Sequence, residues 1–248
     1  MEDRTYIDNL TYATLLSLDG GKSSGSGFFL NFKGNDYLIT ARHVLFNEEE
    51  KRCDTILVSS QNPKSKIEDS TMFEIDVTKA TIFDKKTDDV VAILIGVIVK
   101  SEFKDYVTIV QEGHFKPLSI EEKNLVFMDE IELANDALLI GFPSSLIFQN
   151  SKHFDPGKPL LRKGIIAGIY SEDNTFIVDC SAYYGNSGGP ILELNRKGEL
   201  KIAGIVSRYI PFVIEWRNNR EISLSHIEYS NSGYSVCVPS NAIINLLK

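Results

Sequence analysis

Short apolar runs separated by turn-forming residues recur along almost the whole chain. The runs are rich in Ile, Val, Phe, Tyr and Thr, and helical periodicity is weak until the C-terminus. This pattern predicts an all-β fold, a barrel or a sandwich. The strand candidates are residues 10–18, 28–32, 37–40, 55–59, 73–77, 80–83, 90–95, 107–110, 125–127, 136–143, 162–169, 175–179, 200–207 and 234–238.

Two segments depart from the strand pattern. Residues 100–136 carry many charges and few clear apolar runs, so we expect them to connect two halves of the fold. Residues 240–247 place apolar side chains at helical spacing behind Ser240 or Asn241, and either residue can cap a helix. We therefore expect a short C-terminal helix that packs back on the core.

A loop at residues 184–190 holds three glycines and a proline around Ser187, between two apolar runs. Such residues usually mark a surface turn, but glycines also let backbone N–H groups face a ligand. A serine hydroxyl is a poor nucleophile unless a base takes its proton. The loop therefore raises the question of whether the chain supplies a matching histidine and carboxylate.

Both groups occur at the ends of predicted strands. His43 follows the strand at 37–40, and Asp88 and Asp89 precede the strand at 90–95. A nucleophile, a base and an orienting carboxylate are the groups that acyl transfer needs. Alone, Ser187 fits an exposed turn and His43 fits a core histidine, but together the three groups favour a catalytic site.

Composition and charge exclude several classes of protein. The 248 residues are 43% hydrophobic, which allows a sizeable core. The net charge is −8, and 26 Lys and Arg are scattered among 34 Asp and Glu. A nucleic-acid binder usually carries a basic face, so we expect no nucleic-acid partner. The longest apolar run, 90–99, is too short to span a bilayer, so we expect no membrane partner.

The three cysteines, Cys53, Cys180 and Cys237, cannot form a closed set of disulfides and lack the spacing of a zinc site. We expect buried thiols in a reducing compartment. The polar N-terminus shows no signal-peptide core, so we expect a cytoplasmic protein. The chemistry predicted for Ser187 needs neither a metal nor an organic cofactor.

Two motifs resemble a known family. Residues 40–44 (TARHV) and 185–190 (GNSGGP) are similar to the histidine and serine motifs of trypsin-like (chymotrypsin-fold) serine peptidases. The bacterial Deg/HtrA type is the closer likeness, supported by the segments at 25–28, 164–166, 204–207 and 235–241. The resemblance covers roughly residues 10–248, and the two motifs are its specific part.

The resemblance implies a chymotrypsin-like fold of two six-stranded antiparallel Greek-key barrels with a short C-terminal helix. Residues 1–248 would form a single peptidase domain without a PDZ-like region. The N-terminal barrel is expected at about 8–110, the C-terminal barrel at about 125–238 and the helix at about 240–247. The active site would lie in the cleft between the barrels.

The resemblance also implies residue roles. Ser187 would be the nucleophile, His43 the general base and Asp89 the orienting acid. The N–H groups of Gly185 and Ser187 would form the oxyanion hole, and Ser207 would begin the segment that pairs with the substrate backbone. The remaining residues implied at the substrate pocket are Ser181, Arg208, Tyr209 and Ser235.

Two positions depart from the family pattern. In the family's acid motif, one apolar residue and then a small residue follow the acid. Asp89 fits this spacing if Val91 stands at the position of the small residue, whereas Asp88 fits only with an insertion. The residue before Ser187 is Asn186, which cannot form the ion pair that secreted members make with a new N-terminal amine. We therefore expect a serine loop that is ordered by other contacts.

These features predict a serine endopeptidase that cleaves a protein or peptide through an acyl-enzyme. A catalytically latent or inactive binding module, which needs a regulatory protein partner for activation, is the alternative. An esterase is a third possibility, and the residues do not identify the substrate.

Overall fold

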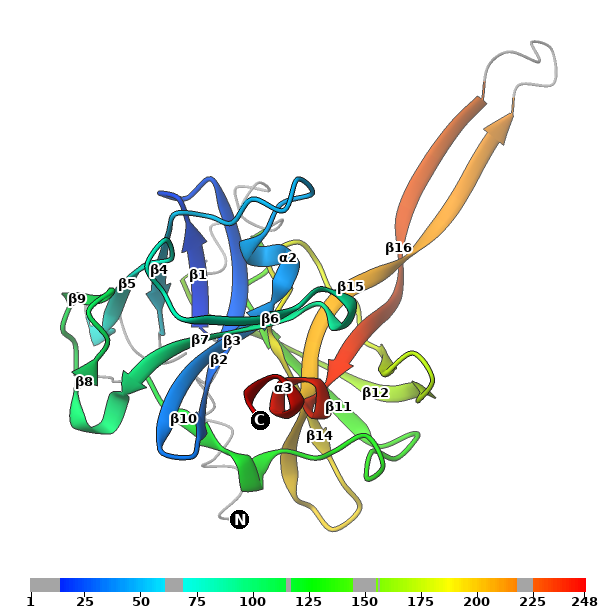
Figure 1. The fold of residues 1–248 in the computed structure, drawn as a ribbon. Coiled ribbons are helices and arrows are strands. Elements are labelled where there is room, and N and C mark those ends of the chain that lie inside the picture. The colour runs from blue at the N-terminus through cyan, green and yellow to red at the C-terminus, as the bar shows by residue number, and fades with distance from the viewer. Residues whose placement is uncertain (1–13, 61–68, 115–116, 145–154, 156, 218–224) are drawn as a thin grey trace.

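The described part of the protein is built mainly from two β-sheets, with a short helix at the C-terminus (Figure 1). The structure is a computed structural model that describes residues 14–60, 69–114, 117–144, 155, 157–217 and 225–248. The all-β, chymotrypsin-like fold predicted from the sequence is confirmed. Residues 10–13 of the first predicted strand lie outside the described residues.

The first sheet is built by the N-terminal half of the chain. It follows the order β6-β7-β3-β2-β1-β4-β5-β9, with β8 paired to β7 and β10 paired in parallel to β2. Leu16, Phe29 and Phe73 belong to the buried cluster inside this half. The strands are β1 Thr14–Leu18, β2 Ser23–Phe32, β3 Asn35–Ala41, β4 Thr55–Ser59, β5 Met72–Asp76, β6 Ile82–Lys85, β7 Val90–Val97, β8 Glu102–Phe103, β9 Val107–Gln111 and β10 Ser119–Glu121.

This half contains more strands than the six expected. Its ten-stranded sheet gains β8, β9 and β10 from the charged residues 100–136, where the sequence pattern predicts only β9 within this sheet. Strand pairing at an open sheet edge uses backbone N–H and C=O groups. Polar segments can therefore add strands that a hydrophobic pattern does not predict.

The second sheet is a closed six-stranded barrel, as expected for the C-terminal half. It follows the order β11-β12-β13-β16-β15-β14 and encloses a cluster that includes Phe176, Ile191 and Cys237. All three cysteines of the chain are buried and free, which confirms the expected core thiols. The strands are β11 Asp136–Gly141, β12 Leu160–Tyr170, β13 Thr175–Asp179, β14 Pro190–Leu194, β15 Leu200–Arg217 and β16 Ser225–Pro239.

A third apolar cluster joins the two halves. It contains Phe28 and Ile39 from the first sheet, Ile205 from the barrel and Ile243 from the C-terminal helix. The helices are α2 Arg42–Leu45, η2 Lys86–Asp88, η3 Ile98–Lys100, η4 Glu122–Asn124 and α3 Ser240–Leu247. None of the helices in the described part of the chain is long and apolar enough to cross a membrane.

The expected side-chain cap of the C-terminal helix is wrong. Pro239 is the N-cap of α3, and no side chain caps its first turn. The Ser240 hydroxyl donates to the carbonyl oxygen of Ile202 at 2.9 Å, and the Asn241 side chain accepts from the N–H of Met128 at 2.6 Å. Both groups therefore tie α3 to the body of the protein instead of capping it.

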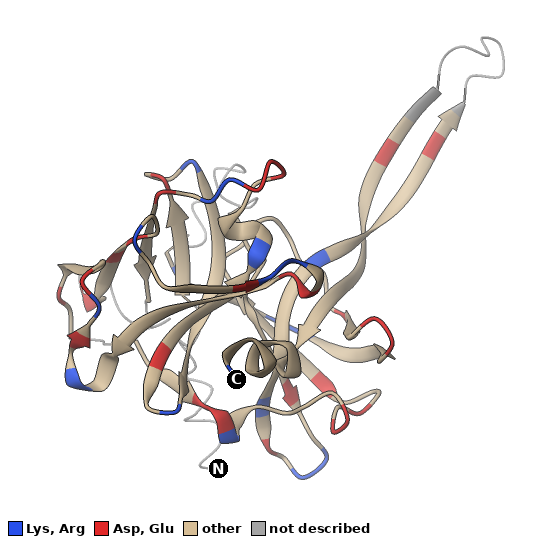
Figure 2. Ribbon diagram, viewed as in Figure 1, with Lys and Arg blue, Asp and Glu red and all other residues tan. Residues whose placement is uncertain are grey.

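A two-stranded arm extends from the barrel, formed by the outer parts of β15 and β16 (Figure 1). Phe212 and Trp216 are exposed on one of its faces, and Val213, Ile227 and Tyr229 are exposed on the other. Basic and acidic positions are interspersed over the described chain, and the arm carries acidic ones (Figure 2). The sequence pattern misses this arm because its apolar residues face no core.

One fully buried serine of the first sheet connects the two halves. Its N–H donates to the carbonyl oxygen of Ser187 at 2.9 Å, and its own carbonyl accepts from the Thr40 hydroxyl at 2.7 Å. The hydroxyl of this residue, Ser26, donates to the carbonyl of Gly185 at 2.6 Å and accepts from the N–H of Phe142 at 2.9 Å. Ser26 therefore fixes the 184–190 loop of the second half against β2.

We expect Ser26→Ala to destabilise the protein by about 1–3 kcal/mol, because the N–H of Phe142 and the carbonyl of Gly185 would lose their buried partner. Urea unfolding measures the change, and Ser171→Ala at an exposed turn is the matched control. An unfolding midpoint of Ser26→Ala equal to that of the control would contradict this role.

Candidate active site

A short helix presents His43 to the boundary between the two halves. The His43 backbone N–H donates to Oδ1 of Asp89 at 3.0 Å, and the ring Nδ1 lies 2.9 Å from Oδ2 and 3.1 Å from Oδ1 of the same carboxylate. This pairing holds the proton of a neutral imidazole on Nδ1 and leaves Nε2 as an acceptor. The His43 side chain is 48% exposed, so Nε2 is accessible to a substrate.

Asp89 accepts hydrogen bonds from both halves of the protein. Besides its contacts with His43, its Oδ2 accepts from the Ser207 hydroxyl at 2.5 Å. Burial raises the pKa of the Asp89 carboxyl, but the hydrogen bonds from His43 and Ser207 and the positive charge that His43 carries when protonated outweigh this effect. The pKa of Asp89 therefore lies below its usual value, and the group is a carboxylate at neutral pH.

The neighbouring acid faces another way. Asp88 accepts from Lys85 Nζ at 2.8 Å and from the Thr87 hydroxyl at 3.0 Å. Asp89 has a left-handed backbone conformation, with φ of 50°, and ends the turn η2. Of the two registers left open by the sequence, the structure therefore brings Asp89 to His43.

The 184–190 loop requires glycine at two positions. Gly185 and Gly188 have φ values of +92° and +81°, which side chains rarely allow. A Cβ on Gly185 would collide with the backbone of Phe142, and one on Gly188 would collide with Thr40 and Ser26. These close approaches seat the loop between the two halves.

Asn186 supports the loop from inside. Its side chain is almost fully buried, and its Oδ1 accepts from the N–H of Tyr183 at 3.0 Å. Its own N–H donates to the carbonyl of Tyr183 at 2.9 Å. The residue that stands in place of the family's ion-paired acid therefore orders the loop through neutral hydrogen bonds.

Two backbone donors are available beside Ser187. Among the described residues, the N–H groups of Gly185 and Ser187 itself have no hydrogen-bond partner. The Ser187 hydroxyl donates to the carbonyl oxygen of Ser207 at 3.2 Å, and within the described chain it makes no hydrogen bond with His43. A rotation about the Ser187 side chain is therefore needed to bring the hydroxyl to Nε2.

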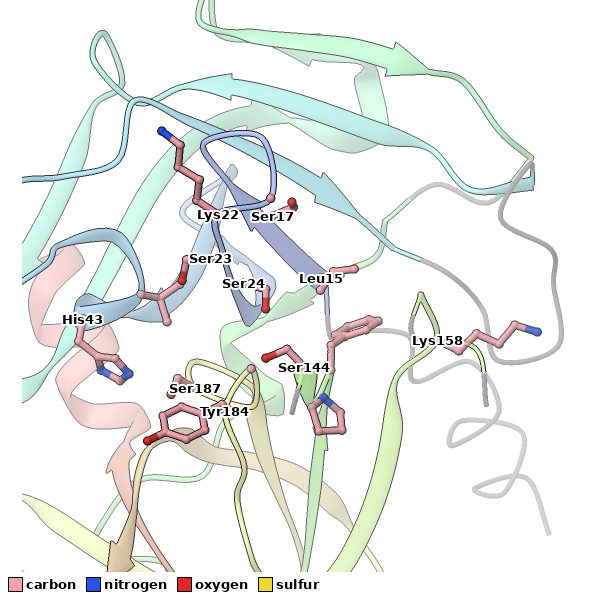
Figure 3. Close-up of a pocket in the computed structure, with 15 residues that line it drawn as sticks. Leu15, Ser17, Lys22, Ser23, Ser24, His43, Ser144, Lys158, Tyr184 and Ser187 are labelled. Atoms are coloured by element: carbon pink, nitrogen blue, oxygen red, sulfur yellow. The ribbon is translucent and has the colours of Figure 1, made fainter. Parts of the chain in front are cut away.

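Two clefts meet at His43. The first cleft has a volume of about 580 Å³, and Ser187, Tyr184 and Lys22 are among the residues that line it (Figure 3). Arg42, Asp89, Ser207 and Arg208 are among those that line the second cleft. Since His43 lines both clefts, it lies between two possible positions for the parts of a substrate.

The structure separates the residues expected at the substrate pocket. Ser207 and Arg208 line the second cleft, whereas Ser181, Tyr209 and Ser235 line neither cleft. Ser235 is fully buried, and its hydroxyl donates to the carbonyl of Cys180 at 2.7 Å and accepts from the N–H of Ala182 at 2.9 Å. These hydrogen bonds hold the Ser235 side chain in the interior of the protein.

An aromatic pair links the serine loop to β15. The rings of Tyr184 and Tyr209 pack edge to face with centroids 6.3 Å apart. A hydrogen bond with the Tyr184 side chain raises the pKa of Tyr209 above its usual value. Of this pair, Tyr209 is one of the residues expected to border the substrate pocket, and Tyr184 lines the first cleft.

Three further contacts fix residues 181–183, and the sequence gives no signal for them. Arg162 donates to the carbonyl of Ser181 at 2.8 Å, and its guanidinium lies 4.7 Å from the centre of the Tyr183 ring. Asn231 donates to the carbonyl of Ala182 at 2.6 Å. The donors come from β12 and β16, which only the closed barrel brings to this segment.

No group of three or more His, Cys, Asp or Glu residues in the described ranges could hold a metal ion. The arrangement that the structure does contain is a serine hydroxyl, a paired imidazole and carboxylate, and two free N–H groups. Such groups suit acyl transfer, in which negative charge develops on an oxygen beside the nucleophile.

Solved structures similar to this chain are proteases of the same fold. A serine endoprotease from Yersinia pestis has 18% sequence identity and a TM-score of 0.54, over 96% of this chain and 61% of that protein. The HtrA-type protease AlgW, solved with a tripeptide, has 16% identity and a TM-score of 0.56, over 98% of this chain and 62% of that protein. Deg5 has 14% identity and a TM-score of 0.54, over 98% of this chain and 90% of that protein.

The chain spans less than two thirds of the length of the first two proteins. A search of curated proteins finds no match. The family model of the trypsin-like peptidase domain matches residues 25–201, a segment that includes His43, Asp89 and Ser187. Since this segment is more than half of the chain, the protein belongs to the trypsin-like peptidase domain family.

Proposed function

We propose that this protein is a serine endopeptidase that hydrolyses peptide bonds through an acyl-enzyme. Membership of the trypsin-like peptidase family supports a serine protease function. The observation that carries the proposal is the paired His43 and Asp89 beside a serine loop whose two N–H groups are free.

In the proposed mechanism, the Ser187 hydroxyl turns from the carbonyl of Ser207 toward Nε2 of His43. Nε2 takes the proton while Oγ attacks the carbonyl carbon of the substrate. The Asp89 carboxylate keeps the proton of Nδ1 in place and stabilises the imidazolium that forms. The oxyanion accepts from the N–H groups of Gly185 and Ser187, each worth about 3–4 kcal/mol in such sites.

The second half of the reaction reverses the direction of proton transfer. His43 gives its proton to the leaving amine, the C–N bond breaks, and the acyl group stays on Ser187. Water then attacks the ester with His43 again acting as the base, and the acid product leaves.

A second function is favoured by the position of the tyrosine pair. The ring of Tyr184 contacts Tyr209, which is expected to border the pocket for the substrate residue before the scissile bond. The Ser187 hydroxyl donates a hydrogen bond to the carbonyl of Ser207 instead of to His43. These contacts support a latent state that a regulatory protein partner opens, or a protease-fold binding module. A serine-directed probe distinguishes the two functions.

We expect a fluorophosphonate to label the wild type stoichiometrically on Ser187 and Ser187→Ala not at all. Hydrolysis of a protein substrate should fall by about 10⁴-fold or more in Ser187→Ala, because the nucleophile is lost. Mass spectrometry locates the label, and circular dichroism shows that the variant is folded. A wild type that is neither labelled nor active, with or without candidate partners, would support the binding module.

The two adjacent acids provide a matched test of the carboxylate. We expect Asp89→Asn to lower kcat by about 10⁴-fold, because an amide cannot hold His43 in the required tautomer. We expect Asp88→Asn to keep nearly the wild-type kcat, because it affects the ion pair with Lys85 and the hydrogen bond from Thr87, neither of which involves His43. Steady-state kinetics on one peptide measures both, and similar losses in the two variants would contradict the role of Asp89.

A further inference from the structure

We propose that the first cleft binds the substrate residues that follow the scissile bond and favours carboxylates there. This inference rests on the proposed peptidase function. The first cleft is the cavity of about 580 Å³ beside Ser187 (Figure 3).

The position of the cleft follows from the direction of the reaction. The acyl part of a substrate is expected along Ser207, which lines the second cleft together with Arg208. His43 must reach the leaving amine to protonate it, and His43 lines both clefts. The leaving side of the substrate therefore extends from Ser187 into the first cleft, away from β15.

The two side chains with a permanent charge that line the first cleft in the described structure are both basic. Lys22 and Lys158 line it, and none of its lining residues within the described chain is acidic. This is unusual in a protein that has 34 Asp and Glu and a net charge of −8. A cleft lined by one sign of charge raises the local concentration of ligands of the opposite sign.

Both lysines are free to bind a substrate. Neither Lys22 nor Lys158 forms an ion pair within the described ranges, whereas Arg42 and Lys86, which line the second cleft, are paired with Glu50. Asp19 interacts electrostatically with Lys22, but its carboxylate is held by the N–H groups of Asp54 and Thr55.

The rest of the lining suits a peptide with polar side chains. Figure 3 shows the hydroxyls of Ser24 and Ser144 in the cleft, with Lys22 and Lys158 toward different ends of it. Hydroxyls can donate to a carboxylate or to a backbone carbonyl of the bound peptide. The volume of this cavity lies in the range of typical ligand sites, so the cavity can hold part of a peptide chain.

The test uses internally quenched peptides with a fixed sequence before the scissile bond. One carries Asp and Glu in the two positions after the bond, and its partner carries Asn and Gln. Both peptides are amidated at the C-terminus. A third peptide, the neutral sequence with a free C-terminal carboxylate, tests whether that carboxylate can replace the acidic side chains. The enzymes are the wild type, Lys22→Gln with Lys158→Gln, and the control Lys33→Gln with Lys100→Gln, which changes the charge equally at exposed positions outside both clefts.

We expect the wild type and the control to cleave the acidic peptide with a kcat/KM about three- to tenfold higher than that of the neutral one, mainly through KM. The preference should vanish in the Lys22 and Lys158 variant and weaken at about 0.5 M salt. Equal kcat/KM for both peptides in the wild type, or a preference that survives in this variant, would overturn the inference.

A binding measurement separates this inference from the proposed function. Fluorescence anisotropy of labelled acidic and neutral peptides with Ser187→Ala needs no turnover. Tighter binding of the acidic peptide, lost when Lys22 and Lys158 are also replaced by Gln, supports the cleft even if no peptide is cleaved. Equal binding of both peptides by Ser187→Ala, together with cleavage of both by the wild type, refutes the proposal for the cleft and leaves the peptidase function intact.

Discussion

The hydrogen bonds of Ser26 are the constraint on which the rest of the site depends. This buried residue of β2 bonds to the carbonyls of Gly185 and Ser187 and to the N–H of Phe142, all in the second half of the chain. These hydrogen bonds hold the serine loop against β2, which pairs with β3, the strand that leads to His43. A second link crosses the same boundary, because the Ser207 hydroxyl of the second half donates a hydrogen bond to Asp89 of the first half. The site is therefore a property of the interface between the two halves, and of neither half alone.

The charges at this interface are distributed unevenly. Around Asp89, basic and acidic side chains are paired, as Arg42 is with Asp84 and Glu50. In the first cleft, Lys22 and Lys158 have no acidic neighbour in the lining that the structure describes. Under the proposed function, Lys22 and Lys158 would select substrates by charge, because a cleft lined by one sign of charge attracts ligands of the opposite sign.

Hydrogen bonds order one part of the serine loop, residues 184–190, and an aromatic contact links another part of it to β15. Asn186 fixes the backbone through Tyr183, which leaves the N–H groups of Gly185 and Ser187 free. The Tyr184 ring meanwhile contacts Tyr209 on the strand that continues into the exposed arm. The serine loop is therefore held by hydrogen bonds within it and by an aromatic contact with β15.

The residue pattern predicts the all-β class and the residues that could react, and the resemblance of two motifs to a known family implies the barrel of the second half. The first two follow from local features, because short apolar runs, turn-forming glycines and a serine motif can be recognised along the chain. The structure shows that Asp89 pairs with His43, gives Ser26 its role and reveals the arm. The pairing of Asp89 and the role of Ser26 depend on contacts between segments far apart in the sequence, whereas the arm is a hairpin of consecutive strands whose apolar residues face no core. The contact of Asp89 with Ser207 spans 118 positions, and that of Ser26 with Gly185 spans 159.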